Sequence, residues 1–319
     1  MRVGLFICDA TGVRTSVADL VAAARAAEDH GFATGWVPHI PWSLDGLSAL
    51  ALAGQATERI ELGTAVMPTY TRHPLAMAQQ ALSAQAAAGG RVALGIGPSH
   101  PVVIETMYGL TYDRPAAHTR EYVEVLRRAF AASAASGEPG GEFVSYEGEF
   151  FRVSSMFVVP GADTPPPILV AALAPLMLRL AGEQTDGTIT YWANERAIGE
   201  HVVPRITRAA EDAGRPAPRV VAGVPVAVVR DADAARERAA HVFSTYESIP
   251  TYQRILDRSG AGPADVAVIG TEADVRARLG AFADAGATDL CAAPLGLDDD
   301  RDASARRTID LLASVAGGR

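Results

Sequence analysis

The sequence predicts an α/β fold in the form of a (β/α)8 TIM barrel, for three reasons. Short apolar runs alternate with longer stretches rich in Ala, Arg and Glu along the whole chain. Eight such pairs fit into 319 residues, an ordinary length for this barrel. Strands joined through helices form a parallel sheet with right-handed crossovers. The rival, a doubly wound open sheet, is disfavoured because residues 4–12 lack the glycine spacing of a dinucleotide-binding turn.

The eight expected strands are short runs dominated by apolar residues. They comprise residues 2–7, 35–38, 61–67, 92–97, 168–171, 187–190, 220–228 and 288–293.

The expected helices carry start and stop signals in several places. Ser16 is a suitable N-cap for a helix over residues 16–30, and Gly31 would end it. Asp45 would cap the second helix, and a glycine pair closes the third. The remaining pattern completes the series, with helices over residues 45–57, 73–88, 116–132, 175–183, 198–213, 232–246, 271–285 and 301–315.

Two insertions interrupt the alternation. After the fourth strand come a loop, residues 98–115, and a β-hairpin over residues 143–153, where apolar and polar residues alternate about Glu147 and Gly148. After the seventh strand, residues 253–263 read as irregular. We expect selectivity to lie in these loops, and residues 1–319 to form a single domain.

Composition narrows the function classes. The net charge of −9 argues against sequence-independent binding of nucleic acid or an anionic membrane surface. There is no lysine, which excludes Schiff-base chemistry on a lysine. Cys8 and Cys291 lie in expected strands and read as small hydrophobic residues. Without a signal peptide or a long apolar run, the expectation is a soluble cytoplasmic protein that acts on a small molecule.

Barrel active sites lie at the C-terminal ends of the strands, which gives a short list of candidates. Asp9 ends the first strand, His39 the second, and Ser99 and His100 follow the fourth. An imidazole titrates near neutrality, so His39 and His100 are the candidate proton-transfer groups. Asp9, His39 and His100 are the only potential metal ligands that the sequence places together at the mouth, and we expect no metal there.

The mouth of the barrel also has room for a flat ligand. Aromatic residues gather there in the sequence map: Trp36, Trp42, Tyr70, Tyr191 and Trp192. Leu173 and Ala174 precede Pro175 at a helix start, where free backbone N–H groups can hold an anion. Locally this is also the pattern of an ordinary strand–helix turn. Together these features suit a hydrophobic ring system with a phosphate tail.

Several segments resemble the luciferase-like flavin- and F420-dependent family. The matching segments are 31–36 (GFATGW), 60–66 (IELGTAV), 72–80 (RHPLAMAQQ), 90–97 (GRVALGIG), 146–151 (YEGEFF), 181–187 (AGEQTDG) and 284–289 (DAGATD). The resemblance implies a barrel whose mouth binds F420 or FMN, with a non-prolyl cis peptide at Ala65-Val66 beneath the ring. It also implies a homodimer, since similar barrels commonly dimerise.

The resemblance assigns residues as well. His39 and His100 match the proton-transferring positions of F420-dependent members, although sugar-phosphate dehydrogenases of this type have glutamate at the second. Those enzymes also use lysines for the sugar phosphate, so such a substrate is disfavoured here. The residues expected to contact the cofactor are Asp9, His39, Ala65, Val66, Met67, Gly97, Ser99, Ala172, Leu173 and Ala174.

The expected reaction is hydride transfer between C5 of coenzyme F420 and a small organic substrate. Reduction of C=C or C=N and oxidation of an alcohol stay open, with His39 or His100 moving the proton. The alternative is an FMN-dependent monooxygenase that uses reduced flavin and O2. A third hypothesis is a barrel that binds the cofactor without turnover.

Overall fold

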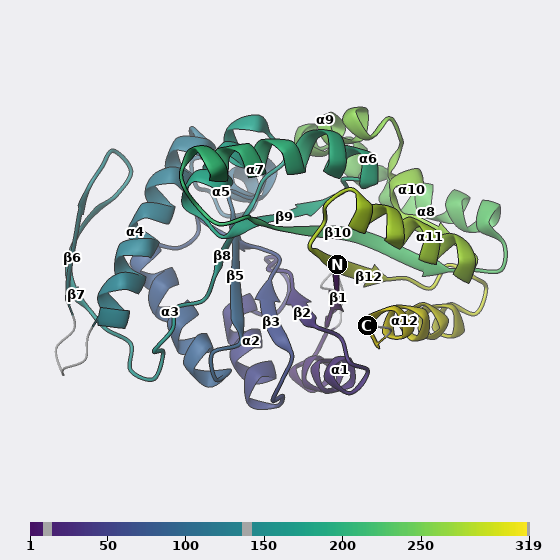
Figure 1. Cartoon of the computed structure of the whole chain (residues 1–319), viewed down its shortest axis with the longest axis horizontal. Coiled ribbons are helices and arrows are strands. Elements are labelled where there is room, and N and C mark those ends of the chain that lie inside the picture. Colours follow the sequence, from purple (N-terminus) through teal and green to yellow (C-terminus); the bar gives the residue numbers. More distant parts are fainter. Residues whose placement is uncertain (9–14, 136–141, 318–319) are drawn as a thin grey trace.

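The computed structural model describes residues 1–8, 15–135 and 142–317, and eight parallel strands close into a barrel surrounded by helices (Figure 1). The ring closes because β9 pairs with β10, which confirms the predicted TIM barrel. In ring order the strands are β1 (Arg2–Phe6), β2 (Thr34–Val37), β3 (Glu61–Thr64), β5 (Val92–Gly97), β8 (Ile168–Ala171), β9 (Gly187–Tyr191), β10 (Arg219–Val228) and β12 (Asp289–Pro294).

The helices begin and end at the residues that supply caps. Ser16 forms a capping box with Asp19 at the start of α1, and Gly31 after that helix has a positive φ of 79°. Asp45 caps α2 through the N–H of Ser48. The helices are α1 (Val17–Asp29), α2 (Gly46–Gln55), α3 (Pro74–Ala87), α4 (Pro115–Ala135), α5 (Pro175–Gln184), α6 (Glu195–Ala197), α7 (Val203–Asp212), α8 (Ala232–Glu247), α9 (Pro250–Ser259), α10 (Pro263–Val266), α11 (Glu272–Asp284) and α12 (Arg301–Gly317). Over the described ranges, none of them has the length and apolar character to cross a bilayer.

The third strand departs from the prediction of one run over residues 61–67. It is divided into β3 and β4 (Met67–Pro68), with the expected cis peptide bond between Ala65 and Val66. At the division the Thr64 hydroxyl donates to the carbonyl of Gly95 (2.7 Å) and accepts its N–H (2.9 Å). The Thr64 side chain therefore replaces backbone-to-backbone hydrogen bonds between β3 and β5 at this point.

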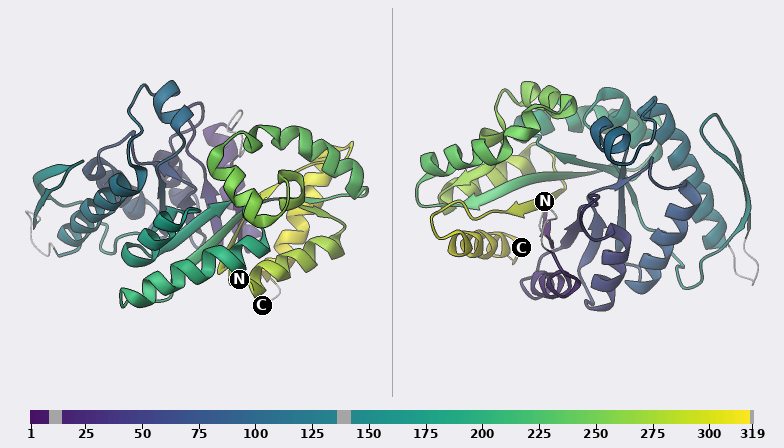
Figure 2. Two further views of the ribbon diagram at one scale, coloured as in Figure 1. Left: turned by 90° about the horizontal axis from the view of Figure 1, so that it is seen from above. Right: turned by 180° about the vertical axis from the view of Figure 1, so that it is seen from behind.

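The insertion after β5 contains more structure than predicted. The expected loop 98–115 includes a π-helix, η1 (Val102–Met107). The expected hairpin is present as β6 (Glu142–Glu147) and β7 (Arg152–Phe157), and both views of Figure 2 place it against the outer side of α4, away from the barrel. The carboxylate of Glu121 on α4 accepts the N–H groups of Glu149 and Phe150, which fixes the tip.

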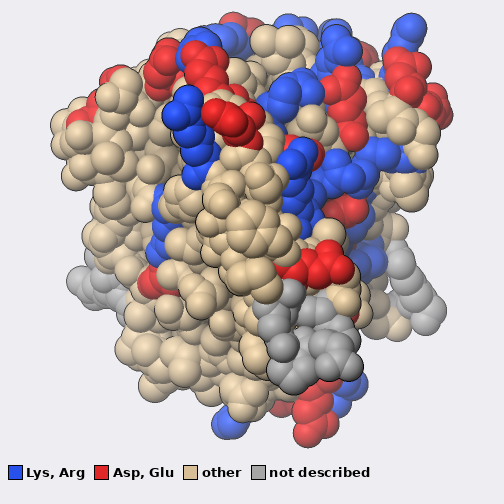
Figure 3. Space-filling model, turned by 90° about the vertical axis from the view of Figure 1, so that its left-hand side faces the viewer, with Lys and Arg blue, Asp and Glu red and all other residues tan. Residues whose placement is uncertain are grey.

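The hairpin also forms part of the molecular surface. Charged side chains gather toward one end of the face on this side, and a broad uncharged area lies beside them (Figure 3). Phe143 and Met156 pair across the two strands and both are exposed.

The prediction that residues 253–263 are irregular is wrong. Residues 253–259 belong to α9 and residue 263 begins α10, and a further strand, β11 (Val268–Gly270), pairs with the end of β10. Pro250 begins α9 at a position where its missing N–H costs nothing, and Gly260 ends it with φ of 64°. The predicted helix 198–213 similarly begins earlier, at α6, and passes through a π-helical segment, η2 (Ile198–Val202).

The barrel interior is filled by side chains that form their own cluster: Trp36, Ala93, Leu169, Ile189, Val221 and Cys291. Trp36 was expected at the mouth, and that prediction is wrong. Its indole lies inside the barrel over Gly63, where a Cβ would come within 2.3 Å of the ring, and its N–H donates to the Thr34 hydroxyl. Side chains alternate across a strand, and the pairing of Trp36 with Phe6 and Gly63 puts it on the inner face.

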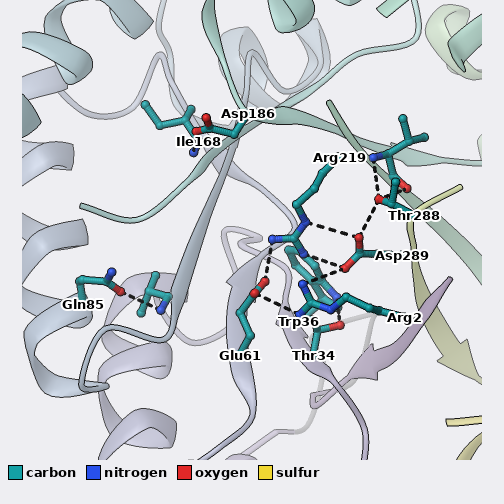
Figure 4. Close-up of polar contacts among 12 residues, drawn as sticks. Arg2, Thr34, Trp36, Glu61, Gln85, Ile168, Asp186, Arg219, Thr288 and Asp289 are labelled. Carbon is teal, nitrogen blue, oxygen red and sulfur yellow. Dashed lines mark hydrogen bonds and ion pairs between the residues drawn. The ribbon is translucent and has the colours of Figure 1, made fainter. Parts of the chain in front are cut away.

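The N-terminal ends of the strands are joined by an ion-pair group. Arg219 bonds to Glu61 (2.8 Å) and Asp289 (2.7 Å), and Arg2 bonds to Glu61 (3.0 Å). Figure 4 shows these side chains converging, with the Thr288 hydroxyl donating to Asp289. Only 2% of the Asp289 side chain is exposed, so the group ties four strands together around a buried carboxylate.

Away from the strand ends, His118 of α4 is buried between the barrel and the hairpin. Its ring stacks on Tyr70 at 3.9 Å and meets Phe150 and Phe151 of the hairpin turn. Burial lowers the pKa of His118 to about 4, although Glu121 opposes the shift. His118 is therefore a packing residue between α4 and the hairpin.

We expect this buried histidine to make stability depend on pH. An ordinary histidine has a pKa of about 6.5. Between about pH 4 and pH 6.5 the unfolded chain therefore binds a proton at His118, whereas the folded chain does not. Stability is therefore full above pH 6.5 and falls by about 3 kcal/mol as pH falls to 4. Urea unfolding of wild type and His118→Phe at pH 7 and pH 4 measures this, since phenylalanine keeps the stacking without the proton. Equal pH dependence in the two proteins would contradict the expectation.

Candidate active site

The C-terminal ends of β3, β4, β5 and β8 form an apolar floor at the mouth of the barrel. Ala65, Val66 and Ala171 are partly buried and pack on the interior cluster. A Cβ at Gly97 would lie 2.9 Å from the Cβ of Ala171 and 3.1 Å from Val66. Glycine is therefore what allows Val66 and Ala171 to approach each other. The result is a closely packed apolar floor, which suits a flat ring.

His39 follows β2 and lies at the start of α2. Its side chain is 9% exposed, and its Nδ1 accepts the N–H of Gly46 at 3.2 Å. Burial lowers the pKa of His39 and the charge of Arg72 lowers it further, whereas Asp45 partly opposes them. His39 is thus neutral at physiological pH.

Arg72 and Asp45 form an ion pair beside His39. Asp45 also accepts the N–H and hydroxyl of Ser48, and these bonds with the Arg72 charge lower its pKa despite burial. A pocket of about 260 Å³ opens here. Its lining residues are His39, Ile40, Pro41, Ser43, Asp45, Thr71, Arg72 and Tyr108.

His100 follows β5 and belongs to the same end of the barrel. Its Nδ1 is buried with no hydrogen-bond partner within the described part of the chain, and its ring lies 5.1 Å from that of Tyr252. Burial lowers the pKa of His100, so it too is neutral near pH 7. The preceding Ser99 has a positive φ of 63°, a conformation that is unusual outside glycine and is found often at functional sites.

An aromatic wall borders the mouth at β9, the strand next to β8 in the ring. Tyr191 and Trp192 at the end of β9 contact Tyr246, and Tyr191 also contacts Tyr252. Trp192 has a positive φ of 62° and packs against Phe243. The sequence placed Tyr191 and Trp192 at the mouth but missed the others, which come from α8 and α9 in the insertion after β10.

The start of α5 lies at the same end of the barrel. Ala174 is its N-cap residue and offers no side-chain cap, and Pro175 follows at the first helical position. The carbonyl of Leu173 accepts a hydrogen bond from His201 Nε2 (2.7 Å), while Arg205 donates to the His201 carbonyl. An uncapped helix N-terminus with an arginine nearby favours an anion. Sequence reasoning missed His201 because it lies on a helical segment far along the chain.

The remaining expected site residues have separate positions. Asp9 lies outside the described residues. Met67 and Ala172 are fully or nearly fully buried, and a Cβ on Gly46 would meet the Met67 sulfur at 2.8 Å. Tyr70 donates its hydroxyl to the carbonyl of Asp113 and faces His118. Within the described ranges no three His, Cys, Asp or Glu side chains come together as a metal site would require.

Comparison with known proteins agrees with this architecture. The luciferase-like monooxygenase family matches residues 1–289. A putative coenzyme F420-dependent oxidoreductase of Mycobacterium tuberculosis is 35% identical over 188 residues, 57% of this chain and 52% of the relative. A 5,10-methylenetetrahydromethanopterin reductase of Methanolobus tindarius is 29% identical over 249 residues, 77% of this chain and 72% of the relative.

A solved structure extends the likeness to the whole fold. The coenzyme F420-dependent tetrahydromethanopterin reductase from Methanopyrus kandleri aligns with a TM-score of 0.79 at 22% identity, over 98% of this chain and 97% of the other. The match of sequence over most of the chain, together with the barrel, establishes that this protein belongs to the luciferase-like monooxygenase family.

Proposed function

We propose that this protein is an oxidoreductase that transfers a hydride between coenzyme F420 and a small organic substrate. The observation that carries the proposal is the combination at one end of the barrel of a flat floor and an uncapped helix start. A planar ring with a phosphate tail needs both features. The likeness to a putative coenzyme F420-dependent oxidoreductase, at 35% identity, supports this choice of cofactor.

The floor residues and α5 would hold the cofactor at its two ends. Val66, Gly97 and Ala171 would lie under the ring, while Leu173 and Ala174 would place the phosphate at the N–H groups of α5. When bound, F420 supplies or accepts the hydride at C5 of its ring. The protein orients the two reactants and excludes water around them.

His100 is the group that we assign to proton transfer. Burial lowers the pKa of His100 and so favours the neutral ring, which would accept a proton from a substrate hydroxyl, and its Nδ1 has no partner in the described ranges. In the reducing direction its protonated form would return the proton. Alcohol oxidation and reduction of C=C or C=N stay open as substrate classes, and the chain would act as a single-domain homodimer in the cytoplasm.

A second candidate is an FMN-dependent monooxygenase that uses reduced flavin and O2. The same floor and the same helix start would suit FMN, and the family includes monooxygenases by name. A barrel that binds the cofactor without turnover is the third.

Titration of the purified protein with F420 and FMN, each oxidised and reduced, distinguishes these candidates. We expect F420 to bind in the micromolar range or tighter and at least about tenfold more tightly than FMN, a difference of about 1.4 kcal/mol. Calorimetry or fluorescence measures both. Selective binding of reduced FMN would contradict the proposal and favour the monooxygenase. Tight F420 binding with no turnover of alcohols, enones or imines would favour the third hypothesis, a barrel that binds the cofactor but catalyses no reaction.

A further inference from the structure

Two groups compete for one nitrogen of His39. Its Nδ1 lies 3.2 Å from the backbone nitrogen of Gly46, which donates to it, and 3.5 Å from Oδ2 of Asp45. The first contact requires Nδ1 to be unprotonated, and the second would favour a proton there. In a neutral ring the nitrogen that carries the proton is a hydrogen-bond donor and the other nitrogen is an acceptor, so the tautomer sets the role of Nε2.

Asp45 is already committed to other partners. One carboxylate oxygen accepts both the N–H (3.0 Å) and the hydroxyl (2.9 Å) of Ser48 as the cap of α2. The other oxygen pairs with the Arg72 guanidinium. A carboxylate that already has these partners depends less on the imidazole 3.5 Å away. The Gly46 N–H, by contrast, is at the first residue of a helix, where N–H groups have no partner within the helix.

The surrounding charges act in the same direction. Asp45, Arg72 and the phenol of Tyr108 are the titratable or charged side chains that share the pocket with His39. The positive end of α2 and the Arg72 charge both disfavour a second proton on the ring, and the side chain is nearly buried. Among these groups, only the negative charge of Asp45 favours a second proton on the His39 ring.

We propose that the Gly46 N–H is a positioning group that holds His39 as the neutral tautomer with its proton on Nε2. His39 then presents only a donor, so that it would give a hydrogen bond to a substrate or cofactor oxygen and take no proton. Under the proposed function, proton transfer then falls to His100. That last step rests on the proposed function, but the tautomer is a property of the free protein.

Histidine-labelled protein tests the tautomer without any ligand. Two-bond 1H–15N correlation spectra of the ligand-free chain distinguish the two nitrogens of each ring, and His39→Asn identifies the His39 signals by their loss. We expect the pattern of a ring protonated on Nε2. At pH 6.5 an ordinary histidine is about one half imidazolium, and we expect the imidazolium fraction of His39 to be clearly smaller. An Nδ1–H pattern, or a fully ordinary protonation, would overturn the proposal.

A matched pair of variants isolates the Gly46 N–H. Gly46→Ala and Gly46→Pro both add a Cβ near the Met67 sulfur, but only proline removes the N–H. Proline is favoured at the first helical position, and Asp45 has the extended backbone (ψ 125°) that precedes proline. We expect Gly46→Ala to keep the wild-type pattern and Gly46→Pro to move the proton to Nδ1, toward Asp45.

The outcomes separate the two proposals. Identical patterns in the alanine and proline variants would overturn the role of the Gly46 N–H. If the proline variant does not fold, the wild-type spectrum still decides the tautomer. Failure of the protein to bind F420 would sink the proposed function and leave the spectra of the ligand-free protein unchanged.

Discussion

Replacement of His100 by alanine is expected to lower turnover by roughly 10²–10⁴-fold, the range that a general acid or base contributes. Under the proposed function the His100 imidazole is the proton-transfer group, and an alanine side chain cannot take up or release a proton. Affinity for F420 should change by less than about threefold, because the floor and the start of α5 are untouched. Single-turnover kinetics of hydride transfer, with separate binding titrations, measure the two quantities.

His241→Ala is the matched control, because His241 is an exposed histidine on α8. It should leave both turnover and F420 affinity unchanged. An unchanged rate in the His100 variant would remove His100 from the reaction and reduce its role to packing against Tyr252. A loss of F420 affinity in place of rate would assign it to binding.

The second large effect concerns stability and lies at the opposite end of the barrel. Asp289→Ala should lower the free energy of unfolding by about 3 kcal/mol, since removing one member of a buried ion pair leaves the opposite charge only partly compensated. The variant would leave Arg219 with only Glu61, and it would remove the nearer of the two acceptors of the Thr288 hydroxyl, whose other acceptor is the Val220 carbonyl. Urea unfolding at pH 7 measures the change, and F420 affinity should stay as in wild type.

An exposed ion pair provides the comparison. Arg208 and Asp212 form an i,i+4 pair in which both side chains are more than two-thirds exposed. Asp212→Ala should therefore change stability by no more than about 0.5 kcal/mol. If Asp289→Ala proves equally mild, water must reach the strand starts, and the ion-pair group does not stabilise the barrel.

Local signals in the sequence were sufficient for most of the barrel. The cap at Ser16 and the stop at Gly31 act within a few residues, so the sequence shows them directly. The division of the third strand was missed because apolar residues run through Ala65 and Val66 without a break. The helix α9 was missed although Pro250 and Gly260 mark its ends, because only Ile255, Leu256 and Ser259 are buried along a polar segment.

The candidate site was predictable as far as it follows strands. The rule that barrel sites lie at strand ends located His39 and His100 without any knowledge of their contacts. It could not locate His201, Tyr246 or Tyr252, which reach the site by tertiary packing from helices. It also misplaced Trp36, because only the strand register decides whether a strand residue faces the interior.

The aromatic wall has a consequence for how this protein can change. Tyr246 and Tyr252 come from the segment between β10 and β11, which makes none of the eight strands and carries no part of the floor. Substitutions there can reshape one side of the binding space while the floor and the start of α5 stay intact. In evolutionary terms the helical side of the wall can vary independently of the barrel strands, and under the proposed function substrate choice would change there while the cofactor site is kept.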